Sequence, residues 1–249
     1  MKDIARFLSG FKSFQRTYFC EDNELFSNLN EAQHPKVLVI ACSDSRVDPA
    51  LLLGVEPGDI FVVRNVANLV PPYETAPGRH GVSAALEYAV KILQVEHVIV
   101  LGHSCCGGIQ ALMAPDRDAL GEFIAPWVTI AEPALRGVAD TLTHKNEELR
   151  QRACEQASVL ISLENLLTFP WLWERVMNGS VYLHGWYFDM HKGELLSYLP
   201  ETGTFEPLVP RCDMAYNPRG DESEMAGEMQ MAHGQRQEKS PAGAGLTLL

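Results

Sequence analysis

The 249-residue sequence lacks the features that mark several classes of protein. No apolar run approaches the ~20 residues that a membrane-spanning helix needs, and the N-terminal residues alternate charged and apolar side chains too closely for the core of a signal peptide. No segment repeats at the period of about 20–50 residues that solenoids and propellers require. Basic residues are outnumbered, with 20 Lys and Arg against 32 Asp and Glu, and they form no compact stripe that could bind polyphosphate. We therefore expect a cytoplasmic protein that binds neither membranes nor nucleic acids.

The remaining composition is that of an ordinary globular protein. Hydrophobic residues make up 46% of the chain and charged residues 21%, which is enough apolar material for one domain of roughly 200–250 residues or for two small ones. The six cysteines are irregularly spaced. Because a chain without an export signal is expected in a reducing compartment, these cysteines are predicted to be thiols or metal ligands and not disulfides.

Three short apolar runs predict the centre of the fold. They comprise residues 37–41, 60–63 and 98–101. Their β-branched side chains and their lack of alternation are typical of strands buried on both faces of a parallel sheet. Helical spacing over residues 81–93 completes a βαβ unit, and residues 181–188 and 195–199 predict an antiparallel hairpin at a sheet edge. We expect an α/β fold with a mainly parallel sheet of four to five strands, flanked by helices.

The sequence predicts three parts along the chain. Residues 1–30 carry apolar side chains at helical spacing and predict an N-terminal helical arm that packs on the domain or on a partner. Residues 31–212 form the α/β domain. Residues 213–249 are rich in Gly, Glu, Gln, Met and Ala without strong periodicity, and we expect a disordered tail.

Two clusters of reactive side chains follow two of the predicted strands. Cys42 comes directly after the first strand, and His103 and Cys106 come after the third. Because ligands bind beyond the carboxyl ends of strands in open α/β sheets, these clusters can meet although they are far apart in the sequence. Thiolates with an imidazole favour Zn²⁺, and three protein ligands leave a fourth tetrahedral position for water. The alternative is two buried thiols and a hydrogen-bonded core histidine, but the grouping at strand ends favours the metal.

Asp44 and Arg46 lie within the first cluster, two residues apart. A carboxylate beside a zinc ion could become its fourth ligand and displace water. A guanidinium that forks onto this carboxylate would instead hold it back as a hydrogen-bond acceptor. The alternative is a surface ion pair, which contributes little to stability.

The sequence resembles the β-class carbonic anhydrases in three motifs. They are Ala-Cys-Ser-Asp-Ser-Arg-Val at 41–47, Val-Arg-Asn-Val-Ala-Asn at 63–68 and Gly-His-Ser-Cys-Cys-Gly-Gly at 102–108. The resemblance implies zinc on Cys42, His103 and Cys106, with Asp44 and Arg46 as the catalytic pair beside it and Cys105 at a variable, non-ligating position. It implies reversible hydration of CO₂ to bicarbonate and a proton by attack of a zinc-bound hydroxide. It also implies a homodimer or higher even oligomer, with the site at the subunit interface.

The resemblance extends to one of the two site types in this family. The gated type needs a Trp just before the first motif, where this chain has Val39-Ile40-Ala41. The open, plant-like type is matched by Gln33 and by Pro71-Pro72. That match implies a CO₂ pocket lined by four residues, although three of them would equally suit a hydrophobic core. The four are Gln33, Phe61, Val66 and Tyr88.

Two alternative functions remain open at this stage. CS₂ or COS hydrolysis could use the same zinc motifs, because these substrates are linear like CO₂. A non-catalytic zinc or bicarbonate-binding regulator would need a closed four-ligand metal, and the Asp44–Arg46 pair and the missing Trp argue against it. No histidine can be assigned as a proton shuttle.

Overall fold

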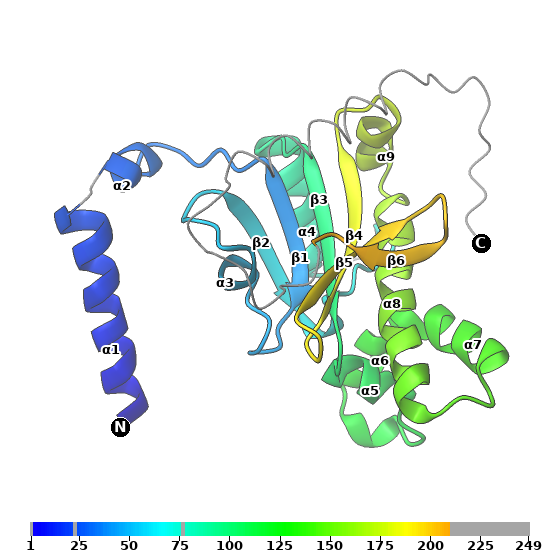
Figure 1. The fold of residues 1–249 in the computed structure, drawn as a ribbon. Coiled ribbons are helices and arrows are strands. Elements are labelled where there is room, and N and C mark those ends of the chain that lie inside the picture. The colour runs from blue at the N-terminus through cyan, green and yellow to red at the C-terminus, as the bar shows by residue number, and fades with distance from the viewer. Residues whose placement is uncertain (1, 22–23, 76–77, 210–249) are drawn as a thin grey trace. The chain divides into compact units, whose positions relative to one another are not determined.

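The computed structural model describes residues 2–21, 24–75 and 78–209, and its centre is a six-stranded sheet (Figure 1). The strand order is β2-β1-β3-β4-β5-β6. The first four strands in this order are parallel to one another, and β5 and β6 are antiparallel. The strands are β1 (Val37–Cys42), β2 (Ile60–Asn65), β3 (His97–His103), β4 (Tyr182–Asp189), β5 (Glu194–Leu199) and β6 (Thr204–Pro207). The prediction of a mainly parallel α/β sheet with a terminal hairpin is confirmed, and the sheet has one strand more than expected.

Helices and short helical turns connect the strands. In chain order they are α1 (Lys2–Gln15), η1 (Arg16–Glu21), α2 (Glu24–Leu29), α3 (Pro49–Leu53), η2 (Val66–Asn68), α4 (Gly81–Glu87), η3 (Tyr88–Ile92), α5 (Gly107–Met113), η4 (Asp118–Leu120), α6 (Ile124–Val128), η5 (Thr129–Ala131), α7 (Glu132–Thr141), α8 (Glu147–Leu166) and α9 (Pro170–Met177). Within the described ranges, no helix is sufficiently long and apolar to cross a membrane.

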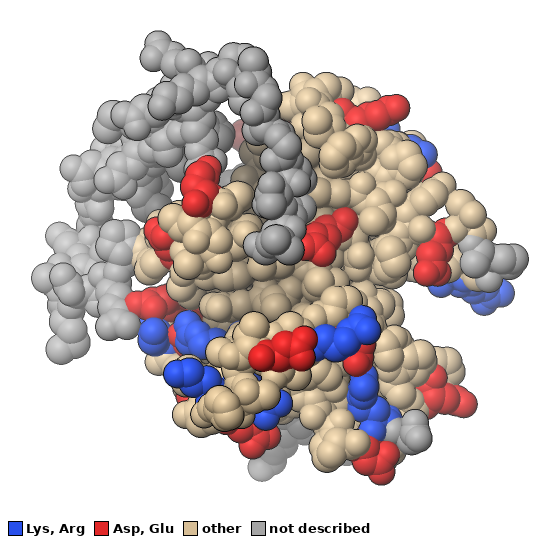
Figure 2. All heavy atoms as spheres, turned by 90° about the vertical axis from the view of Figure 1, so that its right-hand side faces the viewer, with Lys and Arg blue, Asp and Glu red and all other residues tan. Residues whose placement is uncertain are grey.

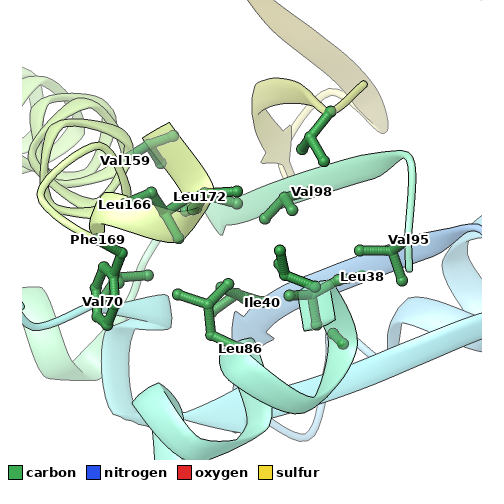
Figure 3. Close-up of a cluster of buried hydrophobic side chains, with 14 residues drawn as sticks. Leu38, Ile40, Val70, Leu86, Val95, Val98, Val159, Leu166, Phe169 and Leu172 are labelled. Atoms are coloured by element: carbon green, nitrogen blue, oxygen red, sulfur yellow. The ribbon is translucent and has the colours of Figure 1, made fainter. Parts of the chain in front are cut away.

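The main hydrophobic core lies between the sheet and the helices α4, α8 and α9. Leu38 and Ile40 of β1 and Val98 of β3 point into it from the sheet, and Leu86 and Leu172 meet them from α4 and α9 (Figure 3). All five side chains are fully buried. Burial of this kind contributes about 1.5–3 kcal/mol for each large apolar side chain, and it explains why these strands read as uninterrupted apolar runs.

Helix α8 is held close against the sheet. Its N-terminus is capped by Asn146, whose side chain accepts a hydrogen bond from the backbone N–H of Leu149. At Gly102 of β3, an added Cβ would lie 2.6 Å from a methyl group of Val159, so only glycine allows this approach. The close packing places the buried face of α8 directly behind the carboxyl end of β3.

Residues 2–21 and 24–29 form helices within the predicted arm. Phe7, Leu8 and Phe11 of α1 are each about three-fifths exposed, and Phe14 packs with Tyr18 and the other aromatic rings of α2 and η1. Packing of this arm on a partner stays a prediction. The predicted tail, from residue 213 onward, lies outside the described residues.

Charged side chains are mixed over the face drawn in Figure 2. Lys and Arg lie among Asp and Glu on it and form no continuous basic area.

Candidate metal centre

The two predicted clusters meet at the carboxyl ends of the central strands. Cys42 is the last residue of β1, His103 is the last residue of β3, and Cys106 immediately precedes α5. The neighbouring, parallel pairing of β1 and β3 brings their ends together. The ligand atoms of the three residues all lie within 4.8 Å of one another, and the two sulfurs are 3.9 Å apart. All three side chains are buried.

The donor atoms of this group fit a zinc ion. The Nδ1 atom of His103 lies 2.9 Å from the carbonyl oxygen of Ser104, so Nδ1 carries the proton and Nε2 keeps a free lone pair. In the part of the chain that the structure describes, this buried Nε2 atom has no hydrogen-bond partner. A buried imidazole nitrogen without a partner, beside two cysteine sulfurs, is the donor set that Zn²⁺ prefers.

The two thiols are electronically unequal. A hydrogen bond from Cys106, opposed by burial, lowers the pKa of Cys42 to about 4. The same hydrogen bond, together with burial, raises the pKa of Cys106. The hydrogen bond between the two sulfurs therefore favours one thiolate in the pair, and the thiolate is the form that binds metals. The backbone N–H groups of Ile109 and Gly108, at the start of α5, hydrogen-bond to the Cys106 sulfur. They lower the pKa of Cys106 and so favour its thiolate.

Cys105 is directed away from the three candidate ligands. Its sulfur lies 3.1 Å from Nε2 of His191, in the turn after β4. Its backbone has a φ of 58°, in the left-handed region that residues other than glycine rarely adopt. That Cys105 does not bind the metal stays a prediction.

Asp44 and Arg46 form a two-pronged ion pair beside the cysteine group. The Nε atom of Arg46 donates to Oδ1 of Asp44 at 2.9 Å, and Nη2 donates to Oδ2 at 2.7 Å. The backbone N–H of Arg46 also donates to Oδ1. The Arg46 guanidinium holds the pKa of Asp44 well below its usual range, against the opposing effect of burial. Arg46 thus holds the Asp44 carboxylate in a fixed position.

Sequence reasoning gave no role to Arg64, which holds the loop that carries these residues. From β2, its Nε donates to the carbonyl oxygen of Cys42 at 2.9 Å and its Nη2 donates to that of Asp44 at 2.6 Å. Its Nη1 pairs with Asp48, whose side chain caps α3. Arg64 lies inside the motif at 63–68, and this membership was the only available signal.

The four predicted pocket residues are only partly brought together. Phe61 and Tyr88 stack with ring centroids 5.9 Å apart. Val66 packs beside the start of α5, since a Cβ at Gly108 would lie 2.7 Å from one of its methyl groups. Gln33 is exposed in the segment before β1. Val66 and Tyr88 are each about two-fifths exposed, so the described residues form no closed pocket around them.

Comparisons with known proteins agree on one family. The family model described as carbonic anhydrase matches residues 37–195. Beta carbonic anhydrase 5, chloroplastic, of Arabidopsis thaliana is 46% identical over 180 residues, which cover 72% of this chain and 59% of that protein. The chain thus spans about three-fifths of the length of that relative.

Solved structures show the same likeness. The β-carbonic anhydrase CcaA superposes with a TM-score of 0.75 at 35% identity, over 85% of this chain and 94% of that one. One of two tetrameric β-carbonic anhydrases from Sordaria macrospora superposes with a TM-score of 0.64 at 30% identity, over 78% and 93%.

Proposed function

The chain belongs to the β-carbonic anhydrase family, and we propose that it is a zinc enzyme that catalyses the reversible hydration of CO₂ to bicarbonate and a proton. The observation that carries this proposal is the buried group of Cys42, His103 and Cys106 beside the Asp44–Arg46 pair. Three ligands with a fourth position open to water are typical of catalytic zinc sites, whereas structural zinc sites have four protein ligands.

Cys42, His103 and Cys106 would hold the zinc ion. Zinc bound there would supply Lewis acidity, which makes water a nucleophile near neutral pH. His103 contributes its free Nε2 atom, because its Nδ1 atom donates to the carbonyl of Ser104. The N–H groups of Gly108 and Ile109 stabilise the thiolate of Cys106.

Asp44 would orient the attacking water. Its carboxylate remains ionised because Arg46 donates to both of its oxygens. An ionised carboxylate accepts a hydrogen bond from the water and so aims a lone pair at the carbon of CO₂. Nη2 of Arg46 also donates to the carbonyl oxygen of Cys105 at 3.0 Å. Arg46 thus connects the loop after β1 with the turn after β3, and it holds Asp44 back from the three candidate ligands.

Gln33, Phe61, Val66 and Tyr88 would line the CO₂ pocket in an even oligomer, a homodimer or higher. The exposure of Val66 and Tyr88 supports this proposal, because an apolar substrate pocket excludes water only when its lining is covered. The exposed apolar side chains of α1 support it as well, since they offer an unpaired surface to a second copy. The Sordaria macrospora relative is described as tetrameric.

The test is stopped-flow CO₂ hydration by the purified zinc-loaded chain, with COS and CS₂ hydrolysis assayed in parallel. We expect CO₂ hydration to be much the fastest reaction. Faster hydrolysis of COS or CS₂ would favour the hydrolase alternative. Zinc binding without turnover of any of these substrates would favour the regulator. Family membership does not favour either alternative.

A further inference from the structure

Glu155 is a buried carboxylate that the proposed mechanism does not use. It projects from α8, and only 3% of its surface is exposed. Its Oε1 atom accepts hydrogen bonds from the backbone N–H of Cys106 at 2.9 Å and from Nε2 of Gln151 at 2.8 Å. Its Oε2 atom accepts one from the hydroxyl of Tyr187 at 2.7 Å. Burial of a carboxylate is costly unless hydrogen bonds compensate it, and here three donors do so.

The backbone that Glu155 contacts is the turn that carries two of the three candidate zinc ligands. Cys105, in the middle of this turn, has a φ of 58°, a conformation that persists only where the surroundings impose it. Among the described contacts, three hydrogen bonds reach backbone groups of Ser104, Cys105 and Cys106 from β4, from the loop after β1 and from α8. The N–H of Ser104 donates to the carbonyl of Phe188 in β4, the carbonyl of Cys105 accepts from Arg46 in the loop after β1, and the N–H of Cys106 donates to Glu155 in α8.

Of the three contacts, the one made by Glu155 lies on a ligand residue itself. Hydrogen bonding of the Cys106 N–H fixes the peptide from which the Cys106 side chain projects. The orientation of that peptide sets the position of the Cys106 Cβ, and the sulfur carried by this Cβ lies 3.9 Å from the sulfur of Cys42. Tyr187 is fully buried, and burial together with the Glu155 carboxylate raises its pKa, so its hydroxyl remains a donor at neutral pH. Gln151 and Tyr187 therefore hold the Glu155 carboxylate in place by hydrogen bonds, and this carboxylate holds the backbone N–H of Cys106.

We propose that Glu155 is a positioning residue for the metal centre, which acts by accepting the Cys106 N–H and so fixes the Cys106 sulfur for zinc. This role rests on the proposed function in that zinc is taken as the metal. Partners of this kind behind a metal site change metal affinity or activity by about 10- to 100-fold when they are removed.

Two substitutions separate the acceptor role of Glu155 from its negative charge. Glu155→Gln keeps an acceptor, because the amide oxygen can take the place of Oε1 and the amide NH₂ can face Tyr187, whose hydroxyl can turn and accept. Glu155→Leu has a similar size but no acceptor. Glu164→Leu is the matched control, because Glu164 lies on the same helix and its side chain is exposed.

The experiment measures zinc affinity of the full chain by competition with a chelator, together with the absorption spectrum of the cobalt(II)-substituted protein. We expect Glu155→Leu to weaken zinc binding by about 10- to 100-fold and to change the cobalt–thiolate bands. We expect Glu155→Gln and Glu164→Leu to match the unchanged protein in both measurements. Unchanged affinity and spectrum in Glu155→Leu would overturn the proposal, and so would an equal loss in Glu155→Gln.

A further variant covers the case in which Glu155→Leu does not fold. Glu155→Asp has a side chain one methylene shorter, which cannot reach both Cys106 and Tyr187, so its zinc affinity should fall. Unchanged affinity in this variant would overturn the proposal. A chain that binds zinc with the expected Glu155 dependence but does not hydrate CO₂ would refute the proposed function alone.

Discussion

Replacement of Arg64 by methionine tests how strongly the loop after β1 depends on one side chain. Arg64→Met keeps most of the aliphatic stem but removes the guanidinium, which donates to the carbonyls of Cys42, Asp44 and Val47 and pairs with Asp48. Each partly buried carbonyl that loses its donor costs about 1–1.5 kcal/mol. The ion pair with the half-exposed Asp48 adds little.

The three carbonyls together give a loss of about 3–4.5 kcal/mol in the free energy of unfolding. For a chain of this size, one kcal/mol corresponds to about 2–4 °C in Tm, so Tm should fall by roughly 10 °C. Scanning calorimetry of the zinc-loaded protein measures this shift. Zinc content should also fall, because the freed carbonyls flank the Cys42 ligand and the Asp44 carboxylate.

Arg64→Lys and Arg136→Met serve as the comparison variants. A lysine keeps the charge, but its single ammonium group cannot serve three carbonyls in fixed directions, so most of the loss should remain. Arg136 is exposed on α7, and its replacement should leave Tm unchanged. The reasoning fails if Arg64→Met melts within about 3 °C of the unchanged protein, or if Arg64→Lys restores full stability.

Three further predictions concern the metal centre and the carboxyl end of β4. Cys106→Ser should lose zinc, and full zinc occupancy in metal analysis would refute the ligand assignment. Arg46→Ala should retain zinc while CO₂ hydration falls by orders of magnitude, because the released Asp44 completes a tetrahedral ligand set; stopped-flow assays at near-normal rates would contradict this. Burial opposes ionisation of Asp189, but Arg152 outweighs it and lowers the pKa of that carboxyl. The pair therefore stabilises the fold above the ordinary Asp pKa of about 3.9, and this contribution is lost as the pH falls through the lower folded value. The stability difference between the unchanged protein and Arg152→Met in urea unfolding should accordingly shrink from pH 6 to pH 3, and a constant difference would refute the assignment.

The parallel part of the fold is predictable from the sequence because β1 and β3 are buried on both faces and the edge strand β2, although only partly buried, carries the same kind of apolar run. The runs that begin at Val37, Ile60 and Val98 are apolar without alternation, and the structure places a strand at each. Strand β6 was missed for the opposite reason. It spans only Thr204–Pro207, it is mostly exposed, and it ends in a proline, so it carries neither an apolar run nor a regular alternation.

The candidate site is predictable as far as its chemistry lies in adjacent residues. Asp44 and Arg46 are two residues apart, and their ion pair could be anticipated from that spacing. Arg64 and Glu155 support the same site through backbone groups that are distant in the sequence. Any residue can supply the peptide group of such a hydrogen bond, so the neighbouring side chains carry no sequence signal for it. These contacts can be identified only in the folded structure, where β2 and α8 lie beside the site.

The order of the strands in the sheet determines when, during folding, the candidate metal centre can acquire its supporting hydrogen bonds. Strand β3 pairs directly with β4, yet the whole of α5 to α9 separates them along the chain. Cys42, His103 and Cys106 can meet once β1 and β3 have paired. The two residues that hydrogen-bond to the turn after β3, Phe188 and Glu155, lie later in the chain. Contacts between segments so far apart form slowly, because the loop must close before it gains any stabilising contact. A nascent chain released from the ribosome only as far as α5 therefore has all three zinc ligands but neither the carbonyl of Phe188 nor the carboxylate of Glu155 that fixes them, and the centre reaches its final geometry in the last stage of folding.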